Sequence, residues 1–125
     1  MSLKKILVVD DDPSTRFLLR LIFEGSGHEV SEAQHGLAAL IKIKDELPDL
    51  VVTDMMMPVM DGGELITHLR SNPRTADVPI LALTANPDAR KAAGDADYVL
   101  GKPFHQAMLL ATVNSILAKQ RSIAG

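Results

Sequence analysis

Residues 51–63 read VVTDMMMPVMDGG, an apolar run that leads into the carboxylate of Asp54. The segment from Leu50 to Val52 is short and apolar, which is typical of a buried strand. Pro58 and the Asp-Gly-Gly sequence at 61–63 then break the chain before a helical pattern resumes. Asp54 is therefore expected at the carboxyl end of a strand, where open α/β sheets place their ligand sites. From this segment alone, a carboxylate that ends a strand and faces water is an equally good interpretation.

The composition indicates one soluble domain. The chain has 125 residues, 46% of them hydrophobic, so we expect a single domain over residues 1–125 with a substantial core. No apolar run approaches the roughly 18 residues of a membrane span, and the run at 6–9 is too short for a signal peptide. Cysteine is absent, the net charge is −3 and no basic cluster occurs, which argues against disulfides and direct nucleic-acid binding. We therefore expect a cytoplasmic protein that does not contact membranes.

Strand-like apolar runs alternate with helical patterns five times. Strands are expected at 4–9, 28–33, 50–53, 78–83 and 98–100. Helices are expected from 13 to the Gly-Ser-Gly sequence at 25–27, and at 36–47, 64–70, 86–93 and 104–119. Strands that alternate with helices form a parallel sheet with helices on both faces and right-handed crossovers. The fold class is therefore α/β, a three-layer sandwich of five βα units.

Spacings of three and four residues predict the core-facing side chains of the helices. The expected set is Phe17, Leu18, Leu21 and Ile22 in the first helix, Ala39, Leu40, Ile43 and Leu47 in the second, Leu65, Ile66 and Leu69 in the third, and Leu109, Leu110, Val113, Ile116 and Leu117 in the last. Asp12 is expected to cap the first helix, and Asp61 to start the third, as acidic residues do at helix N-termini.

Polar residues follow four of the predicted strands: Asp10 and Asp11 the first, Asp54 the third, Thr84 the fourth and Lys102 the fifth. In a parallel sheet these strand ends share one edge, where three carboxylates repel one another unless a cation neutralises them. Hard oxygen ligands without cysteine favour Mg²⁺, or else Mn²⁺, over zinc. A lysine and a hydroxyl beside such a metal are suited to hold a phosphate. The pattern therefore predicts an aspartate that accepts a phosphoryl group in a metal site.

The chain resembles the receiver domain of two-component response regulators, in the form of a single receiver similar to a chemotaxis regulator. The motifs that carry the resemblance are VVDDDP at 8–13, DMMMPVMDG at 54–62, LTA at 83–85 and KPF at 102–104. Each motif alone is modest, but all four occur in order at the predicted strand ends, and together they cover nearly the whole chain. The resemblance implies a flavodoxin-like sheet with strand order 2-1-3-4-5.

The resemblance also implies the roles of the metal-site residues. Asp54 would be the phosphoacceptor, and Asp10 and Asp11 would hold Mg²⁺ together with it. The backbone carbonyl of Met56, two residues after the phosphoacceptor, would complete the protein's share of the metal ligands, and its side chain would line the site.

Three residues are implied to hold the phosphoryl group. Thr84 would bond one of its oxygens, Lys102 would pair with another, and the small side chain of Ala85 would leave room for it. The bond between Lys102 and Pro103 would be cis, an isomer that prolyl bonds adopt readily.

The phosphodonor that the resemblance implies is a histidine kinase or a phosphotransfer protein. The only reactions that it implies are self-phosphotransfer and autodephosphorylation, so the chain is not expected to be an enzyme. The output would pass to an unknown partner or to a fused output domain. The chain is expected to be a monomer or a weak, phosphorylation-dependent dimer.

The remaining side chains of note have structural interpretations. The four histidines lack the spacing of metal ligands and are expected to be solvated: His28, His35, His68 and His105. The methionines at 55–57 and 60 are expected to pack within the loop after Asp54.

Two features depart from the family pattern. The segment between Thr84 and Lys102 is about four residues, or one helical turn, shorter than is usual, so the fourth helix should be short. Val99 stands where receivers often carry an aromatic switch residue, and Tyr98, one position earlier, should point to the other face of its strand. We therefore expect the segment from Pro87 to Ala93 itself to order or shift on phosphorylation.

Two alternatives remain open from the sequence. A haloacid dehalogenase type of phosphatase would use Asp10 as nucleophile and Asp12 as acid and base, although no cap domain or late acidic pair is present. A receiver that binds partners without being phosphorylated is the other, and the full acidic set argues against it.

Overall fold

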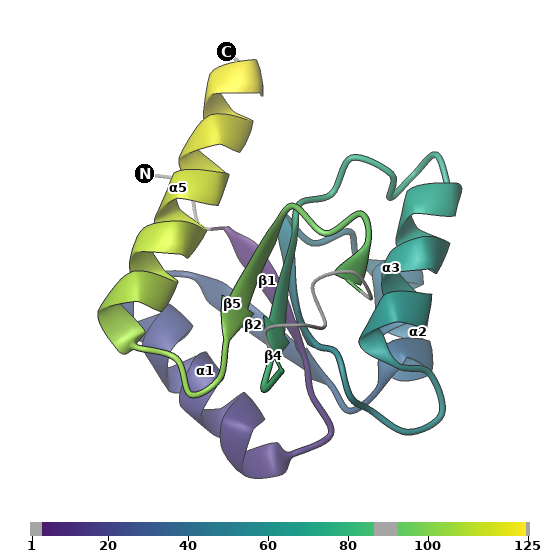
Figure 1. Cartoon of the computed structure of the whole chain (residues 1–125). Helices are drawn as coiled ribbons and strands as arrows, with labels where there is room; N and C mark the ends of the chain where they lie inside the picture. The colour runs from purple at the N-terminus through teal and green to yellow at the C-terminus, as the bar shows by residue number, and fades with distance from the viewer. Residues whose placement is uncertain (1–3, 87–92, 125) are drawn as a thin grey trace.

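The computed structural model of the chain describes residues 4–86 and 93–124, so most of the expected fourth helix lies outside the described residues. Five parallel strands form one sheet in the order β2-β1-β3-β4-β5, as Figure 1 shows. The strands are β1 (Lys5–Val9), β2 (Glu29–Ala33), β3 (Leu50–Asp54), β4 (Ile80–Thr84) and β5 (Tyr98–Gly101). The helices are α1 (Pro13–Gly25), α2 (Gly36–Asp45), α3 (Gly62–Ser71) and α5 (Gln106–Ala124).

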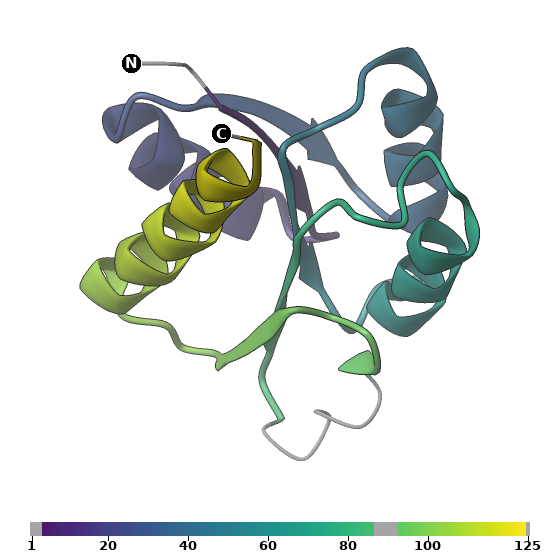
Figure 2. The same cartoon turned by 90° about the horizontal axis from the view of Figure 1, so that it is seen from above.

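The sheet is the middle of three layers. Seen from above, α1 and α5 cover one face and α2 and α3 cover the other (Figure 2). Side chains of the central strands alternate between two hydrophobic clusters, so that Val8 packs with α1 and α5 while Val9 packs with α2 and α3. Every residue of β3 and β4 is buried, as expected for strands covered on both faces. The predicted flavodoxin-like α/β fold and strand order are therefore confirmed.

The helix N-termini begin at hydrogen-bonding side chains. Asp12 caps α1 by accepting from the backbone N–H of Ser14 at 3.0 Å, and Asp61 forms a capping box with Glu64 at the start of α3. Both predictions are confirmed. His35 caps α2, because its Nδ1 accepts from the backbone N–H of Ala38 at 3.1 Å. The prediction that His35 is solvated is therefore wrong.

Of the other three histidines, two are exposed to solvent and one has a buried ring. His68 and His105 are exposed, as predicted. His28 is only partly exposed, and both of its ring nitrogens are buried with no hydrogen-bond partner within the part of the chain that the structure describes. The prediction that His28 is solvated is therefore wrong.

The rotation of α1 differs from the prediction. Phe17 is 61% exposed, Leu18 and Leu21 are also exposed, and the buried side chains are Leu19, Ile22 and Phe23. Apolar residues occupy nearly every position from 17 to 23, so their spacing does not single out one face. In the structure, Arg16 and Arg20 of α1 both pair with Glu32 of β2.

The other helices largely match the prediction, apart from their ends. Leu47 is exposed because α2 ends at Asp45, two residues earlier than expected, whereas Leu40 and Leu110 pack partly buried against the core. The remaining predicted core residues of α2, α3 and α5 are buried. α3 begins two residues earlier than expected, and α5 begins at Gln106 instead of Phe104. None of the helices that the structure describes is both long enough and apolar enough to cross a bilayer.

Gly62 allows α3 to start directly against the end of β3. Its backbone N–H bonds the carbonyl of Met55 at 3.1 Å, and a Cβ added to it would lie 2.5 Å from the carbonyl oxygen of Asp54. Backbone atoms of β3 cannot give way as the end of a flexible side chain can. A glycine at this position therefore fixes how closely the third helix approaches Asp54.

Substitution Gly62→Ala should destabilise the protein by about 1–3 kcal/mol, because the added methyl overlaps with the backbone of β3. Urea unfolding would measure the change. Gly25→Ala is the matched control, since a Cβ at this helical glycine would meet nothing within 4 Å. Equal stabilities of the two variants would contradict the close-approach argument.

Candidate functional site

The carboxyl edge of the sheet brings the predicted polar residues together. Asp10 follows β1, Asp54 and Thr84 are the last residues of β3 and β4, and Lys102 follows β5. Asp10 and Asp54 are only 1% and 9% exposed, whereas Asp11 faces solvent. Two ionisable side chains that are this well buried need charged partners.

Lys102 supplies the positive charge between these carboxylates. Its Nζ lies 3.0 Å from Oδ2 of Asp10 and 3.2 Å from Oδ1 of Asp54. The backbone N–H of Lys102 bonds the carbonyl of Thr84 at 2.7 Å, and the predicted cis bond to Pro103 is present. Lys102 thereby joins the ends of β1, β3 and β4.

The backbone also holds both carboxylates. Oδ1 of Asp10 accepts from the N–H of Asp12 at 2.9 Å, and Oδ1 of Asp54 accepts from the N–H of Met55 at 2.9 Å. The N–H of Asp10 bonds the carbonyl of Ala33, the last residue of β2. These bonds fix both side chains before any ligand arrives, which is what a preorganised site requires.

The acidic side chains fit a divalent cation. One carboxylate oxygen each from Asp10, Asp11 and Asp54 can be chosen so that all three lie within 4.8 Å of one another. A cluster of hard oxygens with one solvent-facing member suits Mg²⁺, which retains some of its water ligands. Sequence reasoning therefore selected three residues that the structure does bring together.

Burial and charge shift two pKa values in the site. Burial raises the pKa of Asp54, the positive charge of Lys102 opposes that rise, and the negative charge of Asp10 adds to it. Burial alone would lower the pKa of Lys102, but the hydrogen bond and charge of Asp10, together with Asp54, outweigh it and raise the pKa. Lys102 therefore stays charged, while Asp54 ionises less readily than an exposed aspartate.

Thr84 is buried at the end of β4, with its hydroxyl bonded to the turn that follows. The hydroxyl donates to the carbonyl of Asn86 and accepts from its N–H, both at 3.1 Å. Ala85, between them, is exposed. A phosphate-binding role for Thr84 would therefore require its hydroxyl to leave Asn86.

The loop after Asp54 is tightly folded. Met55 is buried, and Met57 and Met60 pack partly buried, as predicted, but the side chain of Met56 is 77% exposed. Val59 has a φ of 69°, and the N–H of Met60 bonds the carbonyl of Pro58 across it at 2.7 Å. A β-branched residue in this conformation is strained, by about 1–3 kcal/mol. The loop is nevertheless held in place, because the carbonyl of Met60 accepts from the N–H of Gly36.

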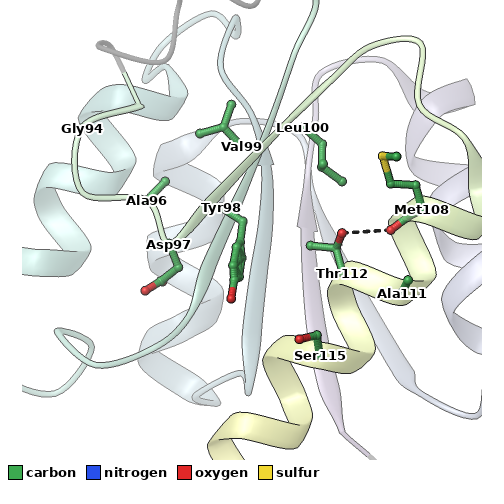
Figure 3. A pocket seen from close by; sticks show the side chains of 10 residues that line it. All are labelled: Gly94, Ala96, Asp97, Tyr98, Val99, Leu100, Met108, Ala111, Thr112 and Ser115. Atoms are coloured by element: carbon green, nitrogen blue, oxygen red, sulfur yellow. Dashed lines mark hydrogen bonds between the residues drawn. The ribbon is translucent and has the colours of Figure 1, made fainter.

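Tyr98 and Val99 point to opposite faces of β5, as predicted. Tyr98 packs with the α1 and α5 cluster and Val99 with the α2 and α3 cluster. Both line a groove of about 570 Å³ between β5 and α5. Figure 3 labels them among the residues that line it. The hydroxyl of Tyr98 accepts from Nζ of Lys119 at 2.8 Å, so this ring is tied to α5 and lies away from the acidic site.

Sequence reasoning missed Arg16, which also reaches the site. Its Nη1 donates to the backbone carbonyl of Asp10 at 2.7 Å, and its Nε donates to Glu32 at 3.1 Å. The only sequence signal for this contact is an arginine one helical turn after the cap of α1.

Comparisons with known proteins agree on one family. The family model described as "Response regulator receiver domain" matches residues 6–114. The phosphate regulon transcriptional regulatory protein PhoB of Rhizobium meliloti (strain 1021) is 38% identical over 124 residues, which cover 95% of this chain and 54% of PhoB. The chain spans about half the length of the curated relatives that it matches.

Solved structures agree as well. A protein from Chloroflexus aurantiacus J-10-fl superposes with a TM-score of 0.90 at 36% identity, covering 94% of this chain and 99% of that one. The response regulator TrrA from Thermotoga maritima, solved in complex with Mg²⁺–BeF, has a TM-score of 0.84 at 34% identity, covering 91% and 99%.

In the metal-free chain, Asp54→Asn should raise the free energy of unfolding at neutral pH. Burial raises the folded-state pKa of Asp54 above its ordinary value of 3.8. The stability that its protonation contributes is complete below the unfolded pKa and is lost as the pH rises through the folded pKa. The gain from the substitution should therefore grow from acid toward neutral pH, as measured by urea unfolding in a chelator.

Asp77→Asn, at an exposed position, serves as the control and should show no comparable growth. An Asp54→Asn variant that is less stable than the parent at neutral pH would show that the pairing with Lys102 outweighs the cost of burial.

Proposed function

This chain belongs to the response regulator receiver domain family, and we propose that Asp54 is its phosphoacceptor, taking a phosphoryl group from the phosphohistidine of a histidine kinase or a phosphotransfer protein. The observation that carries this proposal is the ammonium of Lys102, held within 3.0 Å of Asp10 and 3.2 Å of Asp54 at the acidic edge of the sheet. A nearly buried carboxylate beside a fixed cation and two further carboxylates is suited to phosphoryl transfer.

Asp10, Asp11 and Asp54 would hold Mg²⁺, with the backbone carbonyl of Met56 as a further ligand. When bound, the ion neutralises the acidic cluster and polarises the phosphoryl oxygens. The complex of the relative TrrA with Mg²⁺–BeF supports the choice of magnesium. That comparison gives no support for Mn²⁺.

Each side chain of the site would have its own part in the transfer of the phosphoryl group. A carboxylate oxygen of Asp54 attacks phosphorus, the bond from phosphorus to the donor's imidazole nitrogen breaks, and the imidazole leaves with the electron pair. Lys102 would pair with one phosphoryl oxygen and Thr84 would donate its hydroxyl to another, next to the small side chain of Ala85. The acyl phosphate would later be lost by autodephosphorylation, and no other substrate is turned over.

A phosphatase of the haloacid dehalogenase type is less well supported. That chemistry would need Asp12 as acid and base, yet its two carboxylate oxygens accept from the backbone of Ser14 and the hydroxyl of Thr15. Asp12 is thereby used in capping α1.

The partners of the whole protein are part of the proposal. Residues 1–125 would act as one receiver domain, a monomer or a weak dimer once phosphorylated, meeting its kinase in the cytoplasm. The output would go to a separate partner or to a fused output domain, since relatives of about twice this length are named as transcriptional regulators. No direct binding of nucleic acid by this domain is proposed.

Incubation with acetyl phosphate and Mg²⁺ should label the chain, and Asp54→Asn should reduce the label to background. The label should be stable at neither acid nor alkaline pH, as expected for an acyl phosphate. Asp12→Asn is the matched control, because asparagine also caps helices and the residue lies outside the proposed ligand set. Undiminished label in the Asp54→Asn variant would refute the assignment of the phosphoacceptor.

Mg²⁺ should raise the melting temperature, because a cation that binds only the folded chain relieves repulsion among the carboxylates. At about ten times its Kd, the ion would add about 1.4 kcal/mol to the free energy of unfolding. Asp11→Ala should shrink this rise, whereas Asp77→Ala, at another exposed position, should not. A melting temperature that Mg²⁺ leaves unchanged would argue against the metal site.

A further inference from the structure

We propose that Arg16 is a positioning residue for the acidic site: it holds the peptide group between Asp10 and Asp11 and so sets the affinity of the site for Mg²⁺. The inference rests on the proposed magnesium site. Its direct evidence is the contact between the guanidinium of Arg16 and the main chain of Asp10.

Arg16 makes two different hydrogen bonds through one planar guanidinium group. Its Nη1 donates to the carbonyl oxygen of Asp10 at 2.7 Å, and its Nε donates to Oε1 of Glu32 on β2 at 3.1 Å. The side chain is 18% exposed, so water competes little for these donors. The planar guanidinium fixes the angle between the two bonds, which the single ammonium of lysine cannot do.

The contact lies just past the last sheet bond of β1, which the N–H of Asp10 makes to Ala33 of β2. The ladder between β1 and β3 ends at Val9, so the carbonyl of Asp10 lies past the last strand pairing. That carbonyl belongs to the same planar peptide group as the N–H of Asp11. Fixing it therefore orients both of the acidic residues that β1 delivers to the site.

Glu32 anchors Arg16 and balances its charge. Arg20, one turn further along α1, donates to Oε2 of Glu32 at 2.7 Å. The hydrogen bond from Arg20, followed by that from Arg16, lowers the pKa of Glu32 despite its partial burial, so Glu32 stays ionised. Arg16 can therefore orient Asp10 while its positive charge is largely offset.

Arg20 provides a control that the chain itself supplies. It lies on the same helix and shares Glu32, but its side-chain bonds go to Glu24 and Glu32. A substitution at Arg20 tests the general effect of weakening the contact of α1 with β2. A substitution at Arg16 additionally releases the carbonyl of Asp10.

If Arg16 acts by holding the peptide, its loss should change the Mg²⁺ affinity in the opposite direction from that expected if it acts through its charge. Loss of a positive charge near the cluster would strengthen cation binding, whereas release of the peptide between Asp10 and Asp11 would weaken it. Arg16→Lys keeps the positive charge but loses the two N–H donors that the planar guanidinium holds at a fixed angle. Arg16→Gln loses both the charge and this geometry. If position dominates, both variants bind Mg²⁺ more weakly than the parent.

The test is the Mg²⁺ affinity of the full chain, measured by calorimetric titration, with urea unfolding in a chelator as the stability readout. Arg16→Lys and Arg16→Gln should weaken binding on the order of tenfold, the lower end for residues that orient metal ligands. Arg20→Gln should lower stability without changing the affinity. Amide hydrogen exchange at Asp12, whose N–H bonds Oδ1 of Asp10, should be faster in the metal-free chain of both Arg16 variants and unchanged in Arg20→Gln.

Three results would overturn the proposal. Tighter binding by Arg16→Gln with no change in Arg16→Lys would mean that Arg16 acts through charge alone. Equal losses of affinity in Arg16→Lys and Arg20→Gln would mean that only the packing of α1 matters. Exchange at Asp12 that is no faster in the Arg16 variants than in the parent would mean that Arg16 does not hold the peptide, whereas a parent chain that binds no Mg²⁺ would show that the proposed metal site itself fails.

Discussion

One ammonium group, that of Lys102, lies between two carboxylates that the sheet has removed almost completely from water. Burial of an unpaired charge costs several kcal/mol, so Asp10 and Asp54 can remain ionised at the strand ends only with such a partner. One positive charge does not balance three carboxylates. The site therefore has a residual negative charge, which a divalent cation can neutralise so that an anionic phosphoryl group can approach Asp54.

The surrounding structure serves to keep these groups in place. The end of β3 has no room for a side chain at Gly62, so the third helix starts directly against Asp54. The carbonyl of Met60 bonds the N–H of Gly36, which ties the loop after Asp54 to the start of α2 and holds Val59 in a strained conformation. On the other side, Arg16 links the main chain of Asp10 to β2. Each acidic strand end is thus braced by a neighbouring loop or helix.

The sequence predicted the sheet, and which polar residues meet at its edge, because both follow from short-range patterns along the chain. Apolar runs that stop abruptly at polar residues define the strands, and parallel strands bring Asp10, Asp54 and Lys102 to one edge. The rotation of α1 could not be predicted, because apolar residues occupy nearly every position from 17 to 23 and their spacing does not distinguish the buried face. The role of His35 as a helix cap could not be predicted either, because histidine is not among the usual capping residues. Only the folded structure shows that its Nδ1 accepts from the N–H of Ala38.

The central claim is that Asp54, and not another aspartate at this edge, carries the phosphoryl group. The most direct test is to reduce the phosphorylated chain with borohydride, which converts an acyl phosphate to an alcohol, and to locate the altered residue by peptide mass spectrometry. We expect a single modified residue, Asp54, and only when Mg²⁺ is present during phosphorylation. Modification at Asp10, Asp11 or Asp12, or the same modification without the metal, would contradict it.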